Sequence, residues 1–298
     1  MTARRLAFAV IGDRVASSLS PRMHRAAYAA LGLDCTYDAI PTRDDEVCAM
    51  VDRVRAGELE GLNVTIPHKQ RVLEYVDATD PSVGTVGTAN TLVRTESGEV
   101  VAHNTDIPAL ALELRALAPS THDWPKTHAL VLGTGATARS AVFALGVTLG
   151  CREVTVRGRA VSRSDGAGSL EAELTSLVRT SAGPRTDHRS RIRLESWGAR
   201  EAERDISVIV QATSLGMPGG DTGDLARDAV DWGSVGPAAV ALDVVYADVD
   251  TPFVTAARAH GLAAASGRGM LARQGALAFE LWLHRAAPLD AMLRALSA

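Results

Sequence analysis

Several features that mark other classes of protein are missing from this sequence. No stretch approaches the roughly 20 apolar residues that a membrane-spanning helix needs. The apolar residues after the first two arginines are too few for a signal sequence, so we expect a first strand there. No basic run appears and the formal net charge is −4, which argues against nucleic acid as a partner. Cys35, Cys48 and Cys151 share no metal or redox spacing, so we expect reduced thiols, no metal site and a cytoplasmic location.

Lysine is also scarce, because Lys69 and Lys126 are the only two in the chain and arginine supplies nearly all the remaining positive charge. Lys69 closes the run NVTIPHK at 63–69. Arginine stays charged at any ordinary pH, whereas a lysine ammonium can hand over a proton. Lys69 is therefore a candidate acid/base or substrate-anchoring group, and a solvated surface lysine is the alternative.

What is present is the composition of a globular protein, since 46% of the 298 residues are hydrophobic and 22% are charged. This length fits one large domain or two of moderate size. The first third alternates predicted strands with helical patterns, followed by a hairpin over 88–106. We expect strands at 6–12, 35–40 and 62–67 and helices at 20–32 and 46–57. Strands separated by helices predict an α/β fold with a mostly parallel sheet.

A polar stretch at 119–127 predicts a junction, and a second alternating region follows it. We expect strands at 129–133, 153–156, 206–212 and 238–246 and two helices at the end of the chain. The Gly/Ser/Arg-rich stretch 162–190 predicts one helix at 169–179 and then a mobile loop, whose role the sequence does not indicate.

A glycine pattern, Gly133-x-Gly135-x-x-Ala138, follows a predicted strand and begins a predicted helix. In this context it predicts a dinucleotide site, because the glycines allow a tight turn and a close approach of the backbone to pyrophosphate. The helix N-terminus, starting near Ala136, offers free N–H groups to the phosphates. A small-residue turn that merely packs is the alternative.

The end of the next predicted strand favours NADP over NAD. An NAD site usually has a carboxylate there, to hold the ribose 2′-hydroxyl. This sequence has Arg157, Arg159 and Arg163 instead, and guanidinium groups pair well with a 2′-phosphate. An exposed basic loop is the alternative.

Three polar motifs lie in the first third of the chain, at 18–21 (SLSP), 87–91 (GTANT) and 104–106 (NTD). Each has a structural explanation: Ser20 and Asp106 could cap helices, and Asn90 could stabilise a turn. Loops at strand ends are nevertheless where α/β proteins bind ligands.

Together with 63–69, these motifs resemble the shikimate dehydrogenase family, and the resemblance covers essentially the whole chain. The segments 211–216, 243–246 and 267–274 resemble further motifs of that family. The resemblance implies an α/β fold with an N-terminal substrate domain and a Rossmann-type dinucleotide-binding domain, and a cleft between them. The expected bounds are 1–106, completed by helices at 268–298, for the substrate domain and 124–262 for the NADP-binding domain.

The activity implied by the resemblance is the NADP-dependent reversible reduction of 3-dehydroshikimate to shikimate, a step of the shikimate pathway to aromatic amino acids. Lys69 and Asp106 would be the catalytic pair. The implied substrate-binding residues are Ser18 and Ser20 for the carboxylate, Thr65, Asn90 and Gln274 for ring hydroxyls, and Tyr246. The implied cofactor-binding residues are Gly133, Gly135, Ala136, Ala138, Arg157, Arg159, Arg163, Thr213, Gly267 and Met270.

Some positions depart from the family pattern and keep alternatives open. Ser17 stands where the family usually has His, and Gly158-Arg159-Ala160 stands where it usually has Asn-Arg-Thr. A quinate/shikimate-type or aminoshikimate dehydrogenase is therefore an alternative, NAD is an alternative cofactor, and a non-catalytic NADP-binding metabolite sensor is a third hypothesis. The expected partner is a small-molecule substrate, and the expected state is a monomer or homodimer.

Overall fold

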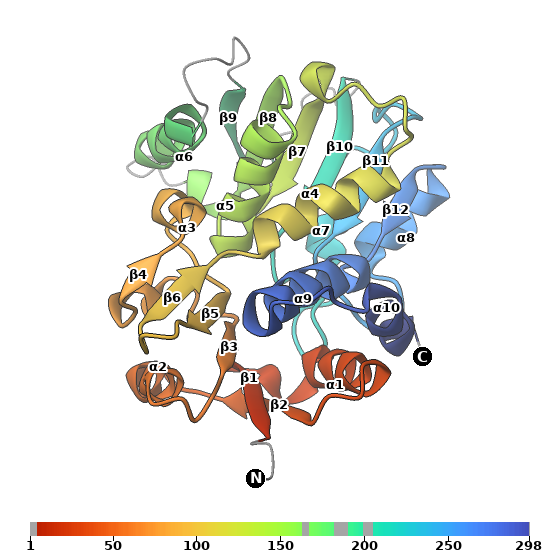
Figure 1. The fold of residues 1–298 in the computed structure, drawn as a ribbon. Coiled ribbons are helices and arrows are strands. Elements are labelled where there is room, and N and C mark those ends of the chain that lie inside the picture. Colours follow the sequence, from red (N-terminus) through yellow and green to blue (C-terminus); the bar gives the residue numbers. More distant parts are fainter. Residues whose placement is uncertain (1–4, 163–166, 182–189, 199–204, 298) are drawn as a thin grey trace. The chain divides into compact units, whose positions relative to one another are not determined.

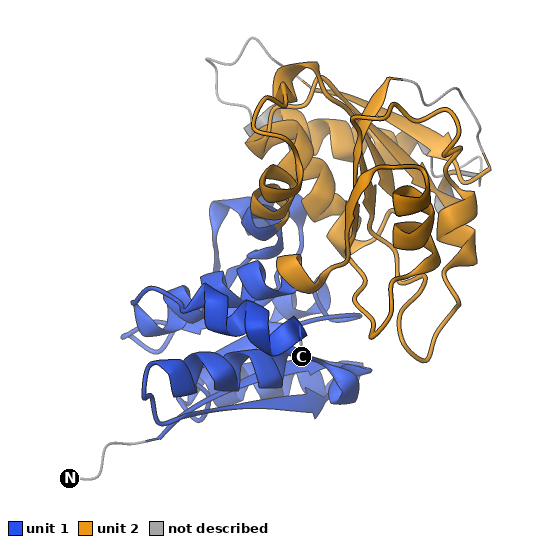
Figure 2. Ribbon diagram, turned by 90° about the vertical axis from the view of Figure 1, so that its right-hand side faces the viewer, with its two compact units in different colours: residues 1–109, 271–298 blue, residues 110–270 orange. Residues whose placement is uncertain are grey.

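The computed structural model describes residues 5–162, 167–181, 190–198 and 205–297. The chain divides into two compact units (Figure 2). Unit 1 comprises Met1–Ala109 and Leu271–Ala298, and unit 2 comprises Leu110–Met270. Strands and helices alternate in both units (Figure 1), so the predicted α/β fold is confirmed.

Unit 1 contains a mixed sheet in the order β2-β1-β3-β5-β6-β4. Strand β1 pairs in parallel with β2 and β3, whereas β5 and β6 form the predicted antiparallel hairpin. The strands are β1 (Leu6–Gly12), β2 (Cys35–Pro41), β3 (Gly61–Val64), β4 (Ala78–Thr79), β5 (Thr91–Arg94) and β6 (Val100–His103).

Both faces of this sheet are covered. Side chains alternate along β1, so its residues pack in two different clusters. Phe8 and Val10 pack in a cluster with the helices α1 (Ser20–Ala30), α9 (Arg268–Leu283) and α10 (Leu289–Ser297). Ala9 and Ile11 pack in a second cluster with α2 (Val47–Arg55). Residues from the end of the chain therefore complete the core of unit 1.

Unit 2 contains a sheet in the order β12-β11-β10-β7-β8-β9, and its described strand pairs are parallel. Counted in order of appearance within the unit, this is the 3-2-1-4-5-6 order of a Rossmann fold. The strands are β7 (His128–Leu132), β8 (Glu153–Gly158), β9 (Arg191–Ser196), β10 (Ile206–Gln211), β11 (Val240–Asp243) and β12 (Ala263–Ala265).

The remaining helices connect these strands or join the units. In unit 2 they are α5 (Ala136–Phe143), α6 (Ala167–Ser181), α7 (Asp224–Asp228) and α8 (Pro252–Ala259). The chain passes between the units within α4 (Asp106–Leu117) and within α9. The helix predicted at 169–179 lies within α6, while 182–189 of the predicted mobile loop lie outside the described residues. None of the described helices combines the length and the apolar character needed to cross a membrane.

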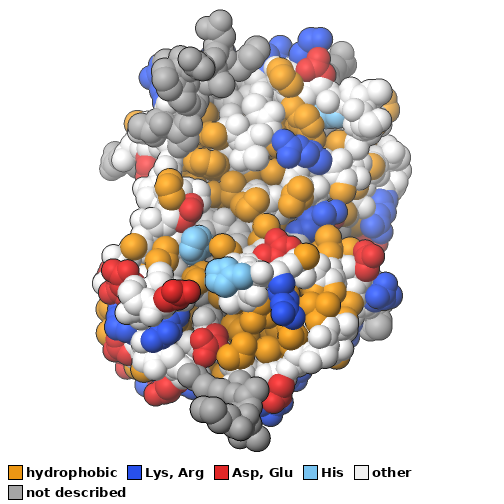
Figure 3. Space-filling model, in the orientation of Figure 1, with side chains coloured by type: hydrophobic (Ala, Val, Ile, Leu, Met, Phe, Trp, Pro, Cys, Tyr) orange, Lys and Arg blue, Asp and Glu red, His pale blue; other side chains and the backbone are white. Residues whose placement is uncertain are grey.

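The surface charges of the described residues are mixed in sign. On the face shown in Figure 3, acidic and basic side chains are interspersed with apolar and uncharged ones. This face of the described chain therefore presents no basic stripe of the kind that tracks a nucleic-acid backbone.

Two local predictions differ from the structure. Ser20 is the first residue of α1 and does not cap it; instead the Ser18 hydroxyl accepts the Ser20 N–H at 3.2 Å. Strand β3 ends at Val64, three residues earlier than expected, because the chain turns there and the His68 N–H donates to the Thr65 carbonyl at 2.9 Å. The helices α3 (Pro81–Val86), α7 and α8 and the strands β4, β9 and β12 were not predicted.

Candidate active site

Four chain segments with predicted site residues meet at one edge of the unit 1 sheet. The carboxyl ends of the parallel strands β1 and β3 lie at this edge, followed by Ser18 and Lys69. Strand β5 is antiparallel to β3, so its first residues, next to Asn90, lie at the same edge. Strand β6 reverses direction again and ends just before Asp106. The topology thus gathers residues that are far apart in sequence.

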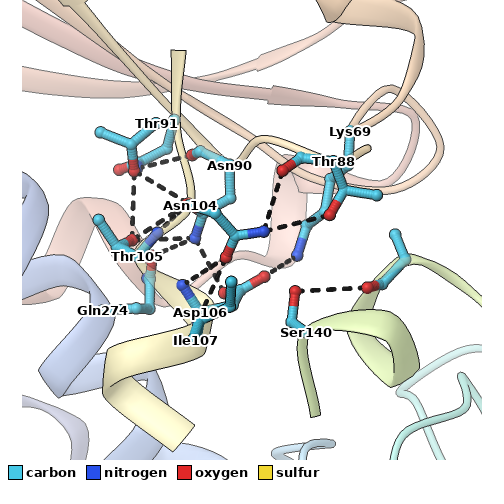
Figure 4. A network of polar contacts seen from close by, with 12 residues as sticks. Lys69, Thr88, Asn90, Thr91, Asn104, Thr105, Asp106, Ile107, Ser140 and Gln274 are labelled. Atoms are coloured by element: carbon cyan, nitrogen blue, oxygen red, sulfur yellow. Dashed lines mark hydrogen bonds and ion pairs between the residues drawn. The ribbon is translucent and has the colours of Figure 1, made fainter. Parts of the chain in front are cut away.

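Lys69 and Asp106, 37 residues apart in the chain, form an ion pair with 2.5 Å between Nζ and Oδ2 (Figure 4). The two side chains are 11% and 7% exposed. Burying two charges costs desolvation energy that their attraction offsets only in part, so such a pair is weak evidence for a stabilising role. An ammonium and a carboxylate held together at the end of a sheet are better suited to moving a proton or anchoring a polar ligand.

Asn104 explains why the Asp106 carboxylate can face Lys69. The Asn104 Oδ1 atom accepts the backbone N–H groups of Asp106 and Ile107 at 3.1 and 3.2 Å, so Asn104 satisfies the start of α4. Its Nδ2 group donates to the Thr88 carbonyl at 3.0 Å. The alternative in which Asp106 caps this helix is therefore not what the structure contains, and the carboxylate is available for other contacts.

Asn90 holds the second oxygen of the same carboxylate. Its Nδ2 group donates to Asp106 Oδ1 at 2.8 Å, and its Oδ1 atom accepts the Thr105 N–H at 2.8 Å. A carboxylate can only accept and a backbone N–H can only donate, so these two contacts fix the orientation of the amide. Gln274 Oε1 on α9 lies 3.3 Å from the same Nδ2 atom, which brings Gln274 to the pair.

Thr65 and Ser18 lie in the loops after β3 and β1, and Ser20 begins α1. The Thr65 N–H donates to the Ile11 carbonyl at 2.9 Å, so Thr65 lies next to the last residues of β1. Ser18 and Thr65 are half-buried, and Ser20 is buried. These positions are compatible with the substrate-binding roles implied by the sequence, which stay predictions.

The glycine pattern in unit 2 forms the expected turn between β7 and α5. Gly133 has a φ of 116°, and a Cβ atom there would lie 3.0 Å from both the Ala212 carbonyl oxygen and Thr213 Cγ2. Thr213 follows β10, and the strand order reverses between β7 and β10, which is where doubly wound sheets bind ligands. Gly135 precedes α5 with no side-chain cap, so the first N–H groups of that helix can face a phosphate. Ala136 begins α5, and Ala138 packs against the core with 1% of its surface exposed.

Arg157 does not have the geometry of a cofactor ligand. Its side chain is 1% exposed, and its Nη2 group pairs with Glu195 Oε2 at 2.7 Å. Its Nη1 group donates to the Ala229 carbonyl at 2.5 Å, just after α7. The predicted role for Arg157 therefore needs correction: the side chain points into the protein because β8 is buried on both faces, and it joins β8 to β9 and α7.

Arg159 is exposed directly after β8, where we expect the residue that binds the 2′-phosphate of NADP. The Thr134 methyl group of the glycine turn lies against neighbouring Gly158, where it occupies the space that a Cβ atom would need. The end of β8 and the glycine turn are thus in contact. Arg163, the third predicted arginine, lies outside the described residues.

The last motifs shape the loop after β11. The buried Asp243 carboxylate accepts the Val245 N–H at 2.9 Å and the Thr251 hydroxyl at 2.6 Å, and burial raises the pKa of Asp243 to about 7. Gly267 donates its N–H to the Val245 carbonyl at 2.9 Å, and a Cβ atom there would overlap the Val244 carbonyl oxygen. Tyr246 is half-buried in this loop, and Met270 is buried in the first turn of α9.

Sequence reasoning gave no role to Asn104, Thr88 or Asp243, although all three lie in motifs that it singled out. Their contacts are with backbone groups and hydroxyls whose position depends on the fold. The helical pattern beginning at Asp106 was a usable signal for Asn104, because Asn is a favoured residue just before a helix.

Comparison with known proteins points to one family. Residues 10–92 match the model of the shikimate dehydrogenase substrate binding domain, and residues 267–296 match that of the shikimate 5′-dehydrogenase C-terminal domain. The NADP(+) shikimate dehydrogenase of Anaeromyxobacter sp. (strain Fw109-5) is 38% identical over 299 residues, with 100% of this chain and 98% of the relative covered.

Two solved structures of different enzymes are similar to this chain over nearly its whole length. Shikimate 5-dehydrogenase from Thermus thermophilus, in complex with NADP(H) and shikimate, has a TM-score of 0.78 and 31% identity, covering 98% of both chains. The ligand-free 5-ketofructose reductase of Gluconobacter sp. strain CHM43 has a TM-score of 0.80 and 25% identity, covering 99% of this chain and 98% of the reductase.

A Rossmann-order sheet with a glycine turn, together with a second α/β unit that carries a buried Lys–Asp pair, defines a nicotinamide-dependent dehydrogenase. Within that class, the full-length identity to curated relatives decides the family. The chain belongs to the shikimate dehydrogenase family.

Proposed function

We propose that this protein catalyses the reversible, NADP-dependent reduction of 3-dehydroshikimate to shikimate. The observation that carries the proposal is the buried pair of Lys69 and Asp106 in a chain of this family. Unit 1 would bind the substrate and unit 2 the cofactor, as expected for domains near 1–106 with 268–298 and near 124–262.

The glycine turn and Arg159 fit NADP. Gly135 and the uncapped start of α5 would hold the pyrophosphate, and the exposed guanidinium of Arg159 would pair with the 2′-phosphate. Gly133, Ala138 and Thr213 shape this turn, while Gly267 and Met270 would lie near the nicotinamide. When bound, NADP supplies or accepts the hydride.

Lys69 would move the proton. In the reducing direction its ammonium faces the carbonyl oxygen of the substrate and donates a proton as negative charge develops there. Asp106 holds the ammonium in place through Oδ2, and Asn90 keeps that carboxylate in position through Oδ1. In the oxidising direction the same lysine accepts the proton of the alcohol.

The substrate is anchored around this pair in the proposal. The hydroxyls of Ser18 and Ser20 would bind the carboxylate, and Thr65, Asn90 and Gln274 would bind ring hydroxyls. Tyr246, from the loop after β11, would complete the substrate contacts. Hydrogen bonds to several hydroxyls discriminate strongly, because an analogue that lacks one leaves a buried polar group without a partner.

Initial rates over a panel of substrates test the proposal. The panel contains shikimate, quinate, aminoshikimate, 3-dehydroshikimate and 5-ketofructose, each with NADP(H) and NAD(H). We expect the highest kcat/KM for shikimate and 3-dehydroshikimate with NADP(H). Higher values for quinate or aminoshikimate would support the alternatives left by Ser17 and the 158–160 segment, and NADPH binding without turnover would support a metabolite sensor.

A cytoplasmic location and a monomeric or homodimeric state also stay predictions. Sedimentation velocity of the purified protein would determine the oligomeric state.

A further inference from the structure

A chain of buried hydrogen bonds leads from the aromatic core of unit 1 to Asp106. The hydroxyl of Tyr37, on β2, donates to Asn63 Oδ1 at 2.6 Å. Asn63, on β3, then donates from Nδ2 to Thr91 Oγ1 at 3.0 Å. Thr91 in turn donates to Asn90 Oδ1 at 3.2 Å, and Asn90 holds Asp106.

The polarity of these bonds is fixed at both ends. The Asp106 carboxylate can only accept, which turns the NH₂ group of Asn90 toward it. Asn63 Nδ2 also donates to the Asn90 carbonyl at 3.0 Å, and a carbonyl can likewise only accept. Asn63 must therefore present its oxygen to the Tyr37 hydroxyl. A group that could only accept a hydrogen bond in place of that hydroxyl would face the Asn63 oxygen and oppose this orientation.

Burial makes each link necessary. Asn63 is 4% exposed and its neighbours on β3 are apolar, while Thr91 and Tyr37 are fully buried. A buried amide without partners loses the hydrogen bonds that water would supply, so Asn63 needs a donor for its oxygen. The Tyr37 ring is held in place by His24, which stacks on it at 4.2 Å with an interplanar angle of 5°.

We propose that Tyr37 is a positioning residue for the Lys69–Asp106 pair and acts through Asn63, Thr91 and Asn90. Its hydroxyl keeps the Asn63 amide in the orientation that supports Asn90, and Asn90 keeps Asp106 directed at Lys69. The kinetic part of this inference rests on the proposed function.

Tyr28 offers a matched control. It lies in the same aromatic cluster and is 2% exposed, but its hydroxyl has no hydrogen-bond partner among the described residues. Tyr37→Phe and Tyr28→Phe thus remove the same atom from the same core, and one of the two removes a link to Asp106.

Steady-state kinetics with 3-dehydroshikimate and NADPH compare the two variants at a temperature where circular dichroism shows both folded. Tyr37→Phe should lower kcat roughly three- to tenfold, the effect of losing one neutral hydrogen bond, with the KM for NADPH unchanged. Tyr28→Phe should retain the wild-type kcat. Equal kcat values for the two variants would overturn the proposal, whether both match the wild type or both are lowered.

Thr91→Val tests the path, because it removes a hydroxyl in the middle of the chain and keeps the side-chain shape. If Tyr37 acts through Thr91, the double variant should lose little more kcat than the more impaired single variant. Losses that multiply in full would show that the two residues act independently and would refute the path.

The scarcity of lysine supplies a readout that does not require turnover. With ¹³C-labelled lysine the protein carries two labelled side chains, Lys69 and the 83%-exposed Lys126. In Tyr37→Phe and Thr91→Val the Lys69 Cε resonance should be displaced, whereas Lys126 should not move and Tyr28→Phe should change neither. An unmoved Lys69 resonance would refute the inference. A wild-type protein inactive on 3-dehydroshikimate but with a displaced Lys69 resonance in Tyr37→Phe would refute the proposed function alone.

Discussion

Lys69 and Lys126 form a natural pair for testing acid/base chemistry at the residue scale. Lys69→Ala should lower kcat by about 10²- to 10⁴-fold, the usual contribution of a positioned proton donor. NADP affinity should stay nearly unchanged, because Lys69 belongs to unit 1 and the glycine turn to unit 2. Stopped-flow turnover and NADPH fluorescence titration measure the two quantities.

Lys126→Ala is the control, since Lys126 is exposed and pairs with Asp123 in unit 2. It should keep wild-type turnover. A comparable loss of NADP affinity in Lys69→Ala would contradict the assignment of the cofactor to unit 2.

Arg159 determines cofactor preference in our proposal. Arg159→Ala should weaken NADP binding about 10- to 100-fold, as expected for the loss of charge-assisted hydrogen bonds to a phosphate, and should change NAD binding little. The ratio of kcat/KM for NADPH and NADH measures this preference. Arg152→Ala, an exposed arginine before the opposite end of β8, should leave the ratio unchanged, and equal losses for both cofactors in Arg159→Ala would remove the 2′-phosphate role.

At the scale of helices and strands, the sequence predicted most of the elements that position the site. Strand β1, the β5–β6 hairpin and the turn from β7 into α5 have strong local signals, namely buried apolar runs and glycines at fixed positions. Strand β9 was missed because it has charged residues on an edge strand, RIRLES, beside a Gly/Ser-rich segment.

Side-chain direction was harder to predict than element type. Arginines 157 and 159 are two residues apart, yet one is buried against Glu195 and the other is exposed. Two residues at this spacing share a face of a strand, but β8 ends at Gly158, so Arg159 leaves the strand and follows a different course. The pairing of Lys69 with Asp106 was expected from family motifs, whereas the chain from Tyr37 to Asn90 depends on contacts across several strands and could not be read from local patterns.

The ion pair of Arg157 and Glu195 joins the neighbouring strands β8 and β9. Arg157→Leu should lower the free energy of unfolding by about 3 kcal/mol, because it leaves the Glu195 carboxylate, whose side chain is only 12% exposed, without its partner. Urea denaturation measures this loss, and the double variant Arg157→Leu/Glu195→Leu should recover much of it. If Arg157→Leu instead keeps wild-type stability and loses NADP affinity, the original cofactor role would be restored.

For the molecule as a whole, two buried titratable groups make the units respond differently to pH. Burial lowers the pKa of His24 in unit 1 from 6.5 to about 3. As the pH falls below 6.5 the unfolded chain binds this proton and the folded protein does not, so stability is lost between pH 6.5 and 3. The raised pKa of Asp243 in unit 2 has the opposite sign, since stability from this group is lost as the pH rises from 3.8 to 7.

Burial also lowers the pKa of His122 and His128 in unit 2, but less than that of His24, so we expect unit 1 to be the more acid-sensitive unit. Protonation linked to His24 should lower the free energy of unfolding by about 2–3 kcal/mol between roughly pH 6.5 and 4.5. His24→Phe, which keeps a ring stacked on Tyr37, should reduce this loss in urea titrations at the two pH values. An unchanged loss in His24→Phe would assign the acid sensitivity to other groups.

The discontinuous course of unit 1 has a consequence for how the protein is made. Phe8 and Val10 pack in one cluster with Ala272, Phe279 and Met292, which a ribosome adds after the last residue of unit 2. All residues of unit 2 have been synthesised before then. One apolar face of the nascent N-terminal segment therefore stays uncovered until these residues are made. The Rossmann unit has the opportunity to fold before then. Folding in that order would reverse the usual one, in which the part that leaves the ribosome first also folds first.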